Sequence, residues 1–273
     1  MGAVGRWAEA LAGWGIPEEI VAAAPESPWR YPPELMRRRV EIAESLEPSA
    51  SLRRATEALP DAGSVLDVGV GGGAASLPLG GIASIVTGVD TSEDMLAAFR
   101  EEASARGIRA SEFVGRWPDV ALLAPSADVV VCNHVLYNVP DIGPFARALD
   151  EHARRRVVIE ITSTHPLAWM NDLWLRFHGL ERPDGPTASD AEAALSELGF
   201  GVRREDEMRE PRASGFADRH DAVSLVRRRL CLPPERDDEV AEALGDRIVE
   251  RHGLWSAGPT GQVVVALWWD AAR

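Results

Sequence analysis

A carboxylate beside a glycine-rich loop is the first feature of the sequence that could do chemistry. The segment 65–73 is a short apolar stretch that contains Asp67 and runs into a loop with Gly69, Gly71 and Gly73. Glycine has no Cβ, so the backbone of such a loop can approach a ligand closely. Asp67 would attract a cation or an ammonium group there, and it would repel the pyrophosphate that a dinucleotide-binding loop holds.

A second carboxylate follows at the end of the next apolar stretch, 85–90. This acid is Asp90, 23 residues beyond Asp67 (90 − 67). A carboxylate at the end of the second strand can accept hydrogen bonds from both hydroxyls of a ribose. The two acids together suit a nucleoside that carries no phosphate.

Polar side chains also follow two later apolar stretches, 128–132 and 156–161. Asn133, His134 and Tyr137 come after the first, and His165 comes after the second. Ligands of open parallel sheets bind at the carboxyl ends of the strands, and an unperturbed imidazole titrates near neutral pH. His134 is therefore our candidate for taking a proton from a bound hydroxyl or amine, with Tyr137 and His165 as further catalytic candidates. The alternative role for His134 is a hydrogen bond to a ligand or a neighbouring loop.

Glu160 lies inside the apolar stretch 156–161. An unpaired carboxylate would be costly in a buried strand. We expect Glu160 to pair with an arginine, and a catalytic role is the alternative.

These residues need a sheet to bring them together, and the pattern from Ser64 onward predicts one. Apolar stretches alternate with helical segments, which is typical of a doubly wound, Rossmann-like α/β fold with a mostly parallel sheet of seven strands. The predicted strands are 65–68, 85–90, 112–114, 128–132, 156–161, 201–208 and 262–269. A helix is predicted between the caps Thr91 or Ser92 and Gly107, whereas Pro78 shortens the helix after the glycine loop.

The remaining segments predict additions to this sheet. Residues 1–60 are expected to form a helical N-terminal cap, with helical spacing at 40–46 and 52–59, and 61–273 to form the main domain. A capping box over Ser189–Glu192 predicts the start of a helix that ends at Gly199. Helices over 220–230 and 235–250 then predict a helical insertion at about 210–260, before the last strand.

Three of these segments resemble motifs of the class I S-adenosylmethionine-dependent methyltransferases. The stretch 65–73 looks like the first motif of that family, 89–95 like its second, and 127–134 like its fourth-strand motif. The resemblance covers roughly residues 60–165, and the last strands fit the antiparallel hairpin of the family. It implies S-adenosylmethionine as cofactor and S-adenosylhomocysteine as product.

The resemblance also implies roles for individual residues. Asp67 and the loop glycines would hold the methionine part of the cofactor, and Asp90 the ribose. Thr91 and Met95 would flank the adenosine. Asn133 and His134 would border the methionine and the reaction centre.

One position departs from the family pattern. The family often has Gly-Asp after the third strand, where the acid binds the adenine amino group, but this chain has Gly115-Arg116-Trp117. Arginine cannot accept that hydrogen bond, so adenine recognition would fall to Asp119, a backbone carbonyl or stacking on Trp117. Arg116 and Trp117 are therefore included among the candidate cofactor contacts.

Composition narrows the choice of partner. The chain has a net charge of −14 and no lysine, which disfavours nucleic-acid backbones and excludes Schiff-base chemistry. Two cysteines are too few for a tetrahedral metal site, and no apolar run reaches membrane-spanning length. The N-terminal residues do not resemble a signal peptide, so we expect a cytoplasmic protein.

The acceptor is expected to be a small molecule methylated at oxygen or nitrogen. After the fourth strand the chain reads Asn133-His-Val-Leu136, without the Asn/Asp-Pro-Pro-Tyr/Phe pattern of amino-methyltransferases that modify bases or glutamine. Two other functions stay open. One is a regulator that binds the cofactor or its product without catalysis, and the other is an NAD(P)-dependent oxidoreductase, against which Asp67 argues.

Overall fold

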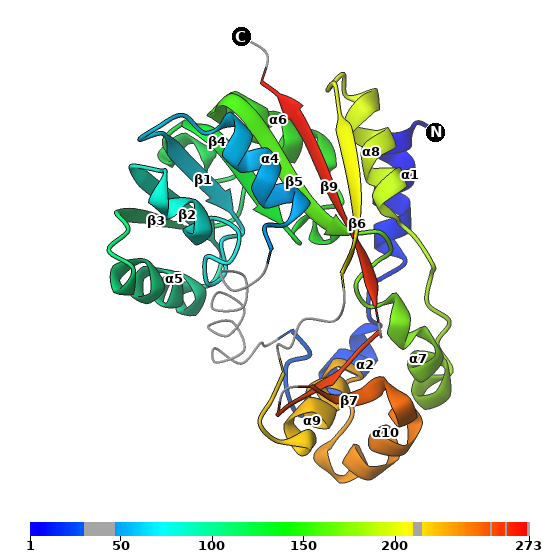
Figure 1. Ribbon diagram of the computed structural model, residues 1–273. Coiled ribbons are helices and arrows are strands. Elements are labelled where there is room, and N and C mark those ends of the chain that lie inside the picture. The colour runs from blue at the N-terminus through cyan, green and yellow to red at the C-terminus, as the bar shows by residue number, and fades with distance from the viewer. Residues whose placement is uncertain (30–46, 210–214, 252, 260, 272–273) are drawn as a thin grey trace.

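A seven-stranded sheet runs through the computed structural model, which describes residues 1–29, 47–209, 215–251, 253–259 and 261–271 (Figure 1). The strand order is β3-β2-β1-β4-β5-β9-β6; β9 pairs antiparallel with β5 and with β6, and all the other pairs are parallel. The predicted doubly wound fold is thereby confirmed. The strands are β1 (Ser64–Val68), β2 (Ile85–Asp90), β3 (Ala110–Val114), β4 (Ala127–Asn133), β5 (Ala153–Thr162), β6 (Arg203–Arg209) and β9 (Gln262–Asp270).

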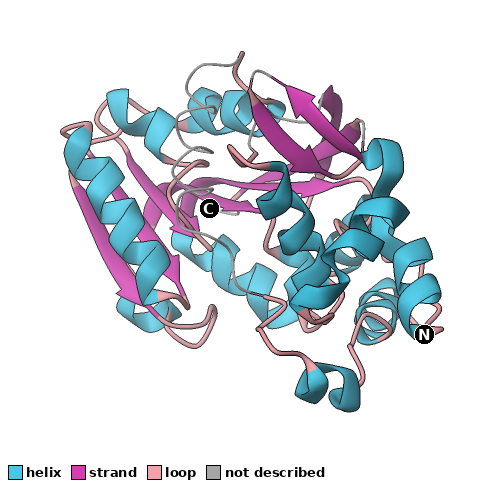
Figure 2. Ribbon diagram, turned by 90° about the horizontal axis from the view of Figure 1, so that it is seen from below, coloured by secondary structure: helices cyan, strands magenta, loops and turns pink. Residues whose placement is uncertain are grey.

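Helices cover both faces of the sheet (Figure 2). The helices α1 (Ala3–Ala12), α6 (Ile142–His152) and α8 (Ala188–Glu197) pack on one face, and α4 (Ala50–Ala58) and α5 (Glu93–Ala105) pack on the other. The central strands β4 and β5 are therefore buried on both sides over 129–132 and 157–161, which explains the mostly apolar sequence of these parts.

The elements on either side of the glycine loop begin and end much as their sequences predict. Ser92 caps α5 by accepting a hydrogen bond from the Met95 N–H, and Gly107 follows the helix with a φ of +66°. A short 3₁₀ helix over Leu77–Gly81 replaces a full helix after the loop. Pro78 at its start and two glycines at its end account for its length.

The capping box predicted at Ser189–Glu192 is wrong by two residues. Thr187 caps α8, because its hydroxyl accepts from the Asp190 N–H and the Asp190 carboxylate accepts from the Thr187 N–H. The sequences from Thr187 and from Ser189 both match the box, and the structure uses the first.

The predicted helix over 235–250 is also wrong in its second half. Helix α10 (Asp237–Leu244) stops where Gly245 takes a φ of +52°, and β7 (Ile248–Arg251) and β8 (Leu254–Ala257) then form a hairpin. The buried residues here are spaced four apart, at Val240, Leu244 and Ile248. This spacing is typical of a helix, but it continues past the end of α10 into β7. The helix predicted at 220–230 is confirmed as α9 (Arg219–Arg229).

The described N-terminal helices contact three separate parts of the molecule. Helix α1 packs on α8, α4 packs on β5 and β9, and α2 (Glu18–Ala23) lies in the group of elements formed by α7 (Asn171–His178), α9, α10 and β7 (Figure 1). The helical spacing at 40–46 lies outside the described residues. None of the helices in the described ranges has both the length and the hydropathy that a bilayer span requires.

Candidate functional site

The Asp67 carboxylate lies at the end of β1 and is completely buried. Its Oδ2 accepts a hydrogen bond from the Ser76 hydroxyl at 2.6 Å, whereas Oδ1 has no partner in the part of the chain that the structure describes. Burial raises the pKa of Asp67 to about 7, and the negative charge of Asp90 adds to the rise. A buried acid with a free oxygen favours a ligand that brings a positive charge or a hydrogen-bond donor.

The glycine loop after β1 needs its glycines. Gly69, Gly71 and Gly73 have φ angles of +77°, +51° and +90°, which residues with a Cβ rarely adopt. A Cβ on Gly69 would lie 2.2 Å from a methyl group of Val135, but a Cβ on Gly71 would meet no described atom within 4 Å. The backbone at Gly71 therefore borders open space.

The second acid, Asp90, fixes this loop from the end of β2. Its Oδ2 accepts from the Gly71 N–H at 2.9 Å and its Oδ1 accepts from the Ser92 N–H at 3.0 Å. Each carboxylate oxygen keeps a second lone pair for a ligand hydroxyl. The structure thus brings together Asp67, Asp90 and the loop, as the sequence predicts.

Asn133 ends β4 on the same face of the sheet as Asp67, because Asp67 pairs with Val131 and side chains alternate along a strand. Asn133 Oδ1 is buried and, like Asp67 Oδ1, lacks a partner within the described ranges. Two unpartnered oxygens at the ends of neighbouring strands suit the N–H groups of a bound ammonium.

A second polar cluster surrounds Glu160 on β5. It lies at the same end of the sheet as Asp67, two strands away from β1. The Glu160 carboxylate is 2 % exposed and accepts from both terminal nitrogens of Arg209, at 3.0 and 2.9 Å, and from the Ser51 hydroxyl. His134 Nε2 lies 3.2 Å from Glu160 Oε1. The expected pairing of Glu160 with an arginine is confirmed.

The charge state of Glu160 follows from these partners. Burial by itself would raise the pKa of its carboxyl, but His134 and Arg209 outweigh burial and hold that pKa well below its usual range. Arg209 and Ser51 are residues that the sequence did not single out. They lie 49 and 109 residues from Glu160, so no local spacing could have indicated them.

The other two catalytic candidates are buried in the core. The Tyr137 hydroxyl donates to the Thr162 carbonyl at 2.7 Å, and burial raises the pKa of this phenol. His165 stacks on Trp14 with ring centroids 3.5 Å apart, and burial lowers the pKa of His165 to about 3. These contacts hold both side chains in place, and His165 also forms part of the wall of the pocket described below.

The residues predicted to contact the adenosine differ in their exposure. Thr91 is exposed beside Asp90, and Met95 is half-buried against the apolar cluster of Phe216 and Ala222. Arg116 is exposed. Trp117 is buried in the core with its ring edge-on to His152, and its indole N–H lacks a partner among the described residues.

A pocket of about 250 Å³ lies beyond the Glu160 cluster, where β5 and β6 end and β9 begins. Its wall includes Ser163, His165, Trp169 and Met208. Both polar and apolar side chains therefore line it, at the same end of the sheet as Asp67, Asn133 and Glu160, which lie among the last residues of their strands.

Comparisons with known proteins relate part of the chain to a known domain. Residues 66–157 match a family model described as "Methyltransferase domain". A search of curated proteins finds no match.

Solved structures share the fold at low sequence identity. A candidate methyltransferase from Bacillus halodurans C-125 is 15 % identical, with a TM-score of 0.54 over 82 % of this chain and 97 % of the other. The YcgJ protein of Bacillus subtilis is 17 % identical, with a TM-score of 0.53 over 82 % and 98 %. At these identities the likeness concerns the fold.

Proposed function

We propose that this chain, which carries the methyltransferase domain of the class I S-adenosylmethionine-dependent enzymes, transfers a methyl group to a small organic molecule at oxygen or nitrogen. The observation that carries the proposal is the Asp67 carboxylate, which is fully buried with one unpartnered oxygen among the described residues. It lies next to a loop whose backbone at Gly71 borders open space.

The residues fit S-adenosylmethionine better than a dinucleotide. Asp67 and Asn133 offer acceptor oxygens to the ammonium group of the methionine part. Asp90, already bonded to the Gly71 and Ser92 N–H groups, offers its remaining lone pairs to the ribose hydroxyls. A pyrophosphate in this place would face two carboxylates and is disfavoured.

The cofactor supplies an activated methyl group on a positively charged sulfur. The chain has to align the acceptor and exclude water. His134 is the one catalytic candidate that is substantially exposed, with 47 % of its side chain accessible. We assign His134 to the acceptor, and Tyr137 and His165 to the packing beneath it.

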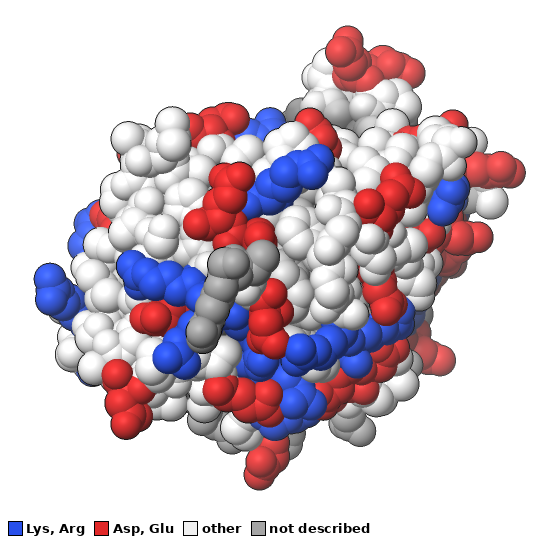
Figure 3. Space-filling view, turned by 90° about the horizontal axis from the view of Figure 1, so that it is seen from above, with Lys and Arg blue, Asp and Glu red and all other residues white. Residues whose placement is uncertain are grey.

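A small acceptor agrees with the charges of the chain. The net charge is −14, and arginines lie interleaved with carboxylates on the face shown in Figure 3. Such a surface repels a nucleic-acid backbone. The pocket beside Trp169 and Met208, about 250 Å³ in volume, has room only for a small molecule or part of one.

Calorimetry with S-adenosylhomocysteine tests the cofactor, and transfer of a tritiated methyl group to a panel of small phenols and amines tests the activity. We expect binding and transfer. Binding without transfer to any acceptor would favour a regulator. No heat at millimolar ligand, together with a fluorescence response to NADPH, would favour an oxidoreductase.

A further inference from the structure

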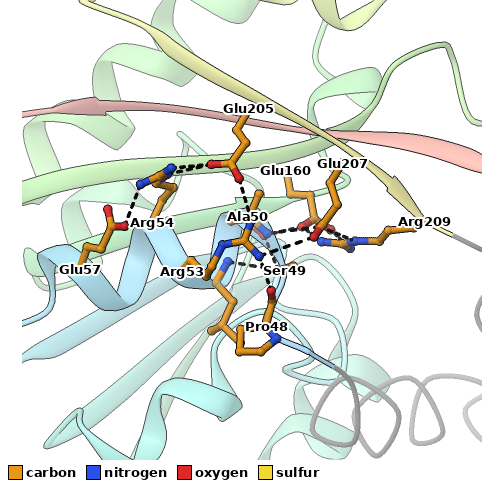
Figure 4. Close-up of polar contacts among 12 residues, drawn as sticks. Pro48, Ser49, Ala50, Arg53, Arg54, Glu57, Glu160, Glu205, Glu207 and Arg209 are labelled. Carbon is orange, nitrogen blue, oxygen red and sulfur yellow. Dashed lines mark hydrogen bonds and ion pairs between the residues drawn. The ribbon is translucent and has the colours of Figure 1, made fainter.

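The buried carboxylate of Glu160 has more partners than an ion pair needs. Arg209 already binds both of its oxygens (Figure 4), and Ser51 on α4 adds a hydroxyl. A buried ion pair of this kind is often no more stable than a pair of apolar side chains of similar size. Stability alone therefore gives a weak reason for Glu160 to stand in β5.

His134 is held against this carboxylate in a strained conformation. Its φ is +60°, and its backbone N–H donates to the Glu160 carbonyl at 2.6 Å while its ring nitrogen Nε2 lies 3.2 Å from Oε1. A left-handed conformation is unfavourable for a residue with a Cβ. Strain of this kind is commonly kept where a side chain must be aimed at a ligand.

The two nitrogens of the His134 ring are in different surroundings. Nε2 faces an ionised acceptor, so it carries the proton when the ring is neutral. Nδ1 makes no hydrogen bond to any residue in the described ranges, and 47 % of the side chain is exposed. The free lone pair is then on Nδ1.

We infer that Glu160 is a positioning residue, which fixes His134 with Nε2–H toward its own carboxylate and so presents the Nδ1 lone pair to the methyl acceptor. This inference rests on the proposed function and specifies the acceptor group. We take the group to be a hydroxyl, whose reacting atom carries a proton at neutral pH that a base must remove; an amine present as ammonium would need the same base.

Transfer of the methyl group to the hydroxyl forms one carbon–oxygen bond and breaks one carbon–sulfur bond. The hydroxyl proton moves to Nδ1 as an oxygen lone pair forms the bond to the methyl carbon. The electron pair of the broken carbon–sulfur bond stays on sulfur, which becomes a neutral thioether. The positive charge passes to the His134 ring, where the Glu160 carboxylate stabilises it.

Nitrogen NMR of the full chain tests the inference without an acceptor. Two-bond ¹H–¹⁵N spectra at about pH 8 report which nitrogen of each neutral imidazole carries the proton. His134→Gln assigns the His134 signals among the six histidines. We expect the Nε2–H form of His134 to exceed the other by about tenfold or more, because an ionised carboxylate 3.2 Å from Nε2 favours a proton on that nitrogen. A protonated Nδ1, or an even mixture, would overturn the inference.

Glu160→Gln and Glu205→Gln form a matched pair of variants. Both replace a carboxylate that pairs with arginine, but Glu205 pairs with Arg53 and Arg54 instead of Arg209 (Figure 4). We expect Glu160→Gln to lower the His134 tautomer ratio about threefold or more, since a neutral acceptor binds a proton donor about half as strongly. Glu205→Gln should leave the ratio unchanged. An equal ratio in both variants would show that Glu160 does not position the ring.

The wild-type spectrum decides the question even where a variant fails to fold. Binding of S-adenosylhomocysteine to the same samples is measured separately by calorimetry. Absent binding would refute the proposed function and leave the tautomer result standing, so the two failures are distinguishable.

Discussion

Two buried carboxylates at the same edge of the sheet differ in their partners and in their charge. Asp67 and Glu160 are 0 % and 2 % exposed. Asp67 has a single hydrogen bond from Ser76 and a pKa raised to about 7, whereas Glu160 has Arg209, Ser51 and His134 around it and a lowered pKa. Burial is the same, so the partners determine the charge.

The difference separates two kinds of site. An acid whose partners come from the chain is part of the scaffold, and it can orient other groups such as His134. An acid left with a free oxygen is unstable in its ionised form until a ligand supplies the missing positive charge. The Asp67 carboxylate is therefore prepared for a ligand, whereas the Glu160 carboxylate already has its partners and acts on a ligand only through His134.

Among the variants that test this comparison, Asp67→Asn should change the free energy of unfolding most. The carboxyl pKa is 3.8 in ordinary surroundings and about 7 in the fold, so the folded state holds its proton over a range where the unfolded state has lost it. The contribution of Asp67 to wild-type stability therefore falls as the pH rises from about 4 to 7 and then levels off. At about pH 8 the Asn variant should be more stable by about 4 kcal/mol, a gain that shrinks at lower pH. Urea unfolding across this range measures it, and a constant difference would contradict the raised pKa.

Glu160→Ala should lower the stability of the protein, whereas Asp67→Asn should raise it. Glu160→Ala leaves Arg209 and Ser51 without their buried acceptor, and we expect a loss of about 3 kcal/mol in the free energy of unfolding. The control is the double variant Glu160→Leu/Arg209→Leu, which removes both charges and should lose less than about 1 kcal/mol. Equal losses of unfolding free energy in the single and the double variant would show that the cost of Glu160→Ala does not come from leaving Arg209 without its partner.

Asp90→Asn tests the ligand side of the comparison. The neutral amide loses the charge-assisted hydrogen bonds to the ribose, and affinity for S-adenosylhomocysteine should fall by about 2 kcal/mol, or roughly 30-fold. Asp94→Asn is the control, because Asp94 is an exposed acid in the first turn of α5. Calorimetry that gives the same Kd for both variants would place the ribose elsewhere.

Gly71→Ala should give the smallest effect. The φ of Gly71 is +51° and the space around it is open, so alanine introduces strain without a clash and should cost about 1 kcal/mol of stability. Gly81 also borders open space but has no positive φ, and Gly81→Ala should cost less. Thermal unfolding of the two variants measures the difference, and identical melting temperatures would argue against strain at Gly71.

Local sequence was sufficient to predict the region around Asp67. The acid, the glycines and Asp90 belong to two consecutive strand–loop units, so their apolar stretches and turn residues predict where each one lies. The strand over 85–90 and the helix after Ser92 have the predicted positions for the same reason.

The region around Glu160 could be predicted only in part. The cost of a buried carboxylate indicated an arginine partner. It could not indicate which one, because Arg209 lies on β6 and its side chain extends across β9 to reach Glu160 on β5. The left-handed backbone of His134 depends on its bond to the Glu160 carbonyl, a contact between strands that residue type does not encode. Similarly, the helical spacing of Val240, Leu244 and Ile248 could not reveal the turn at Gly245.

The pairing of Arg209 with Gln262 has a consequence for the segment between them. These residues end β6 and begin β9, and they face one another in the ladder. Between them, the described residues 215–251 and 253–259 add no strand to this sheet, because β7 and β8 form a separate two-stranded sheet. Shortening the segment between Arg209 and Gln262 to a tight turn would turn β6 and β9 into an ordinary hairpin with unchanged register, so this part of the gene is where length can vary without altering the sheet.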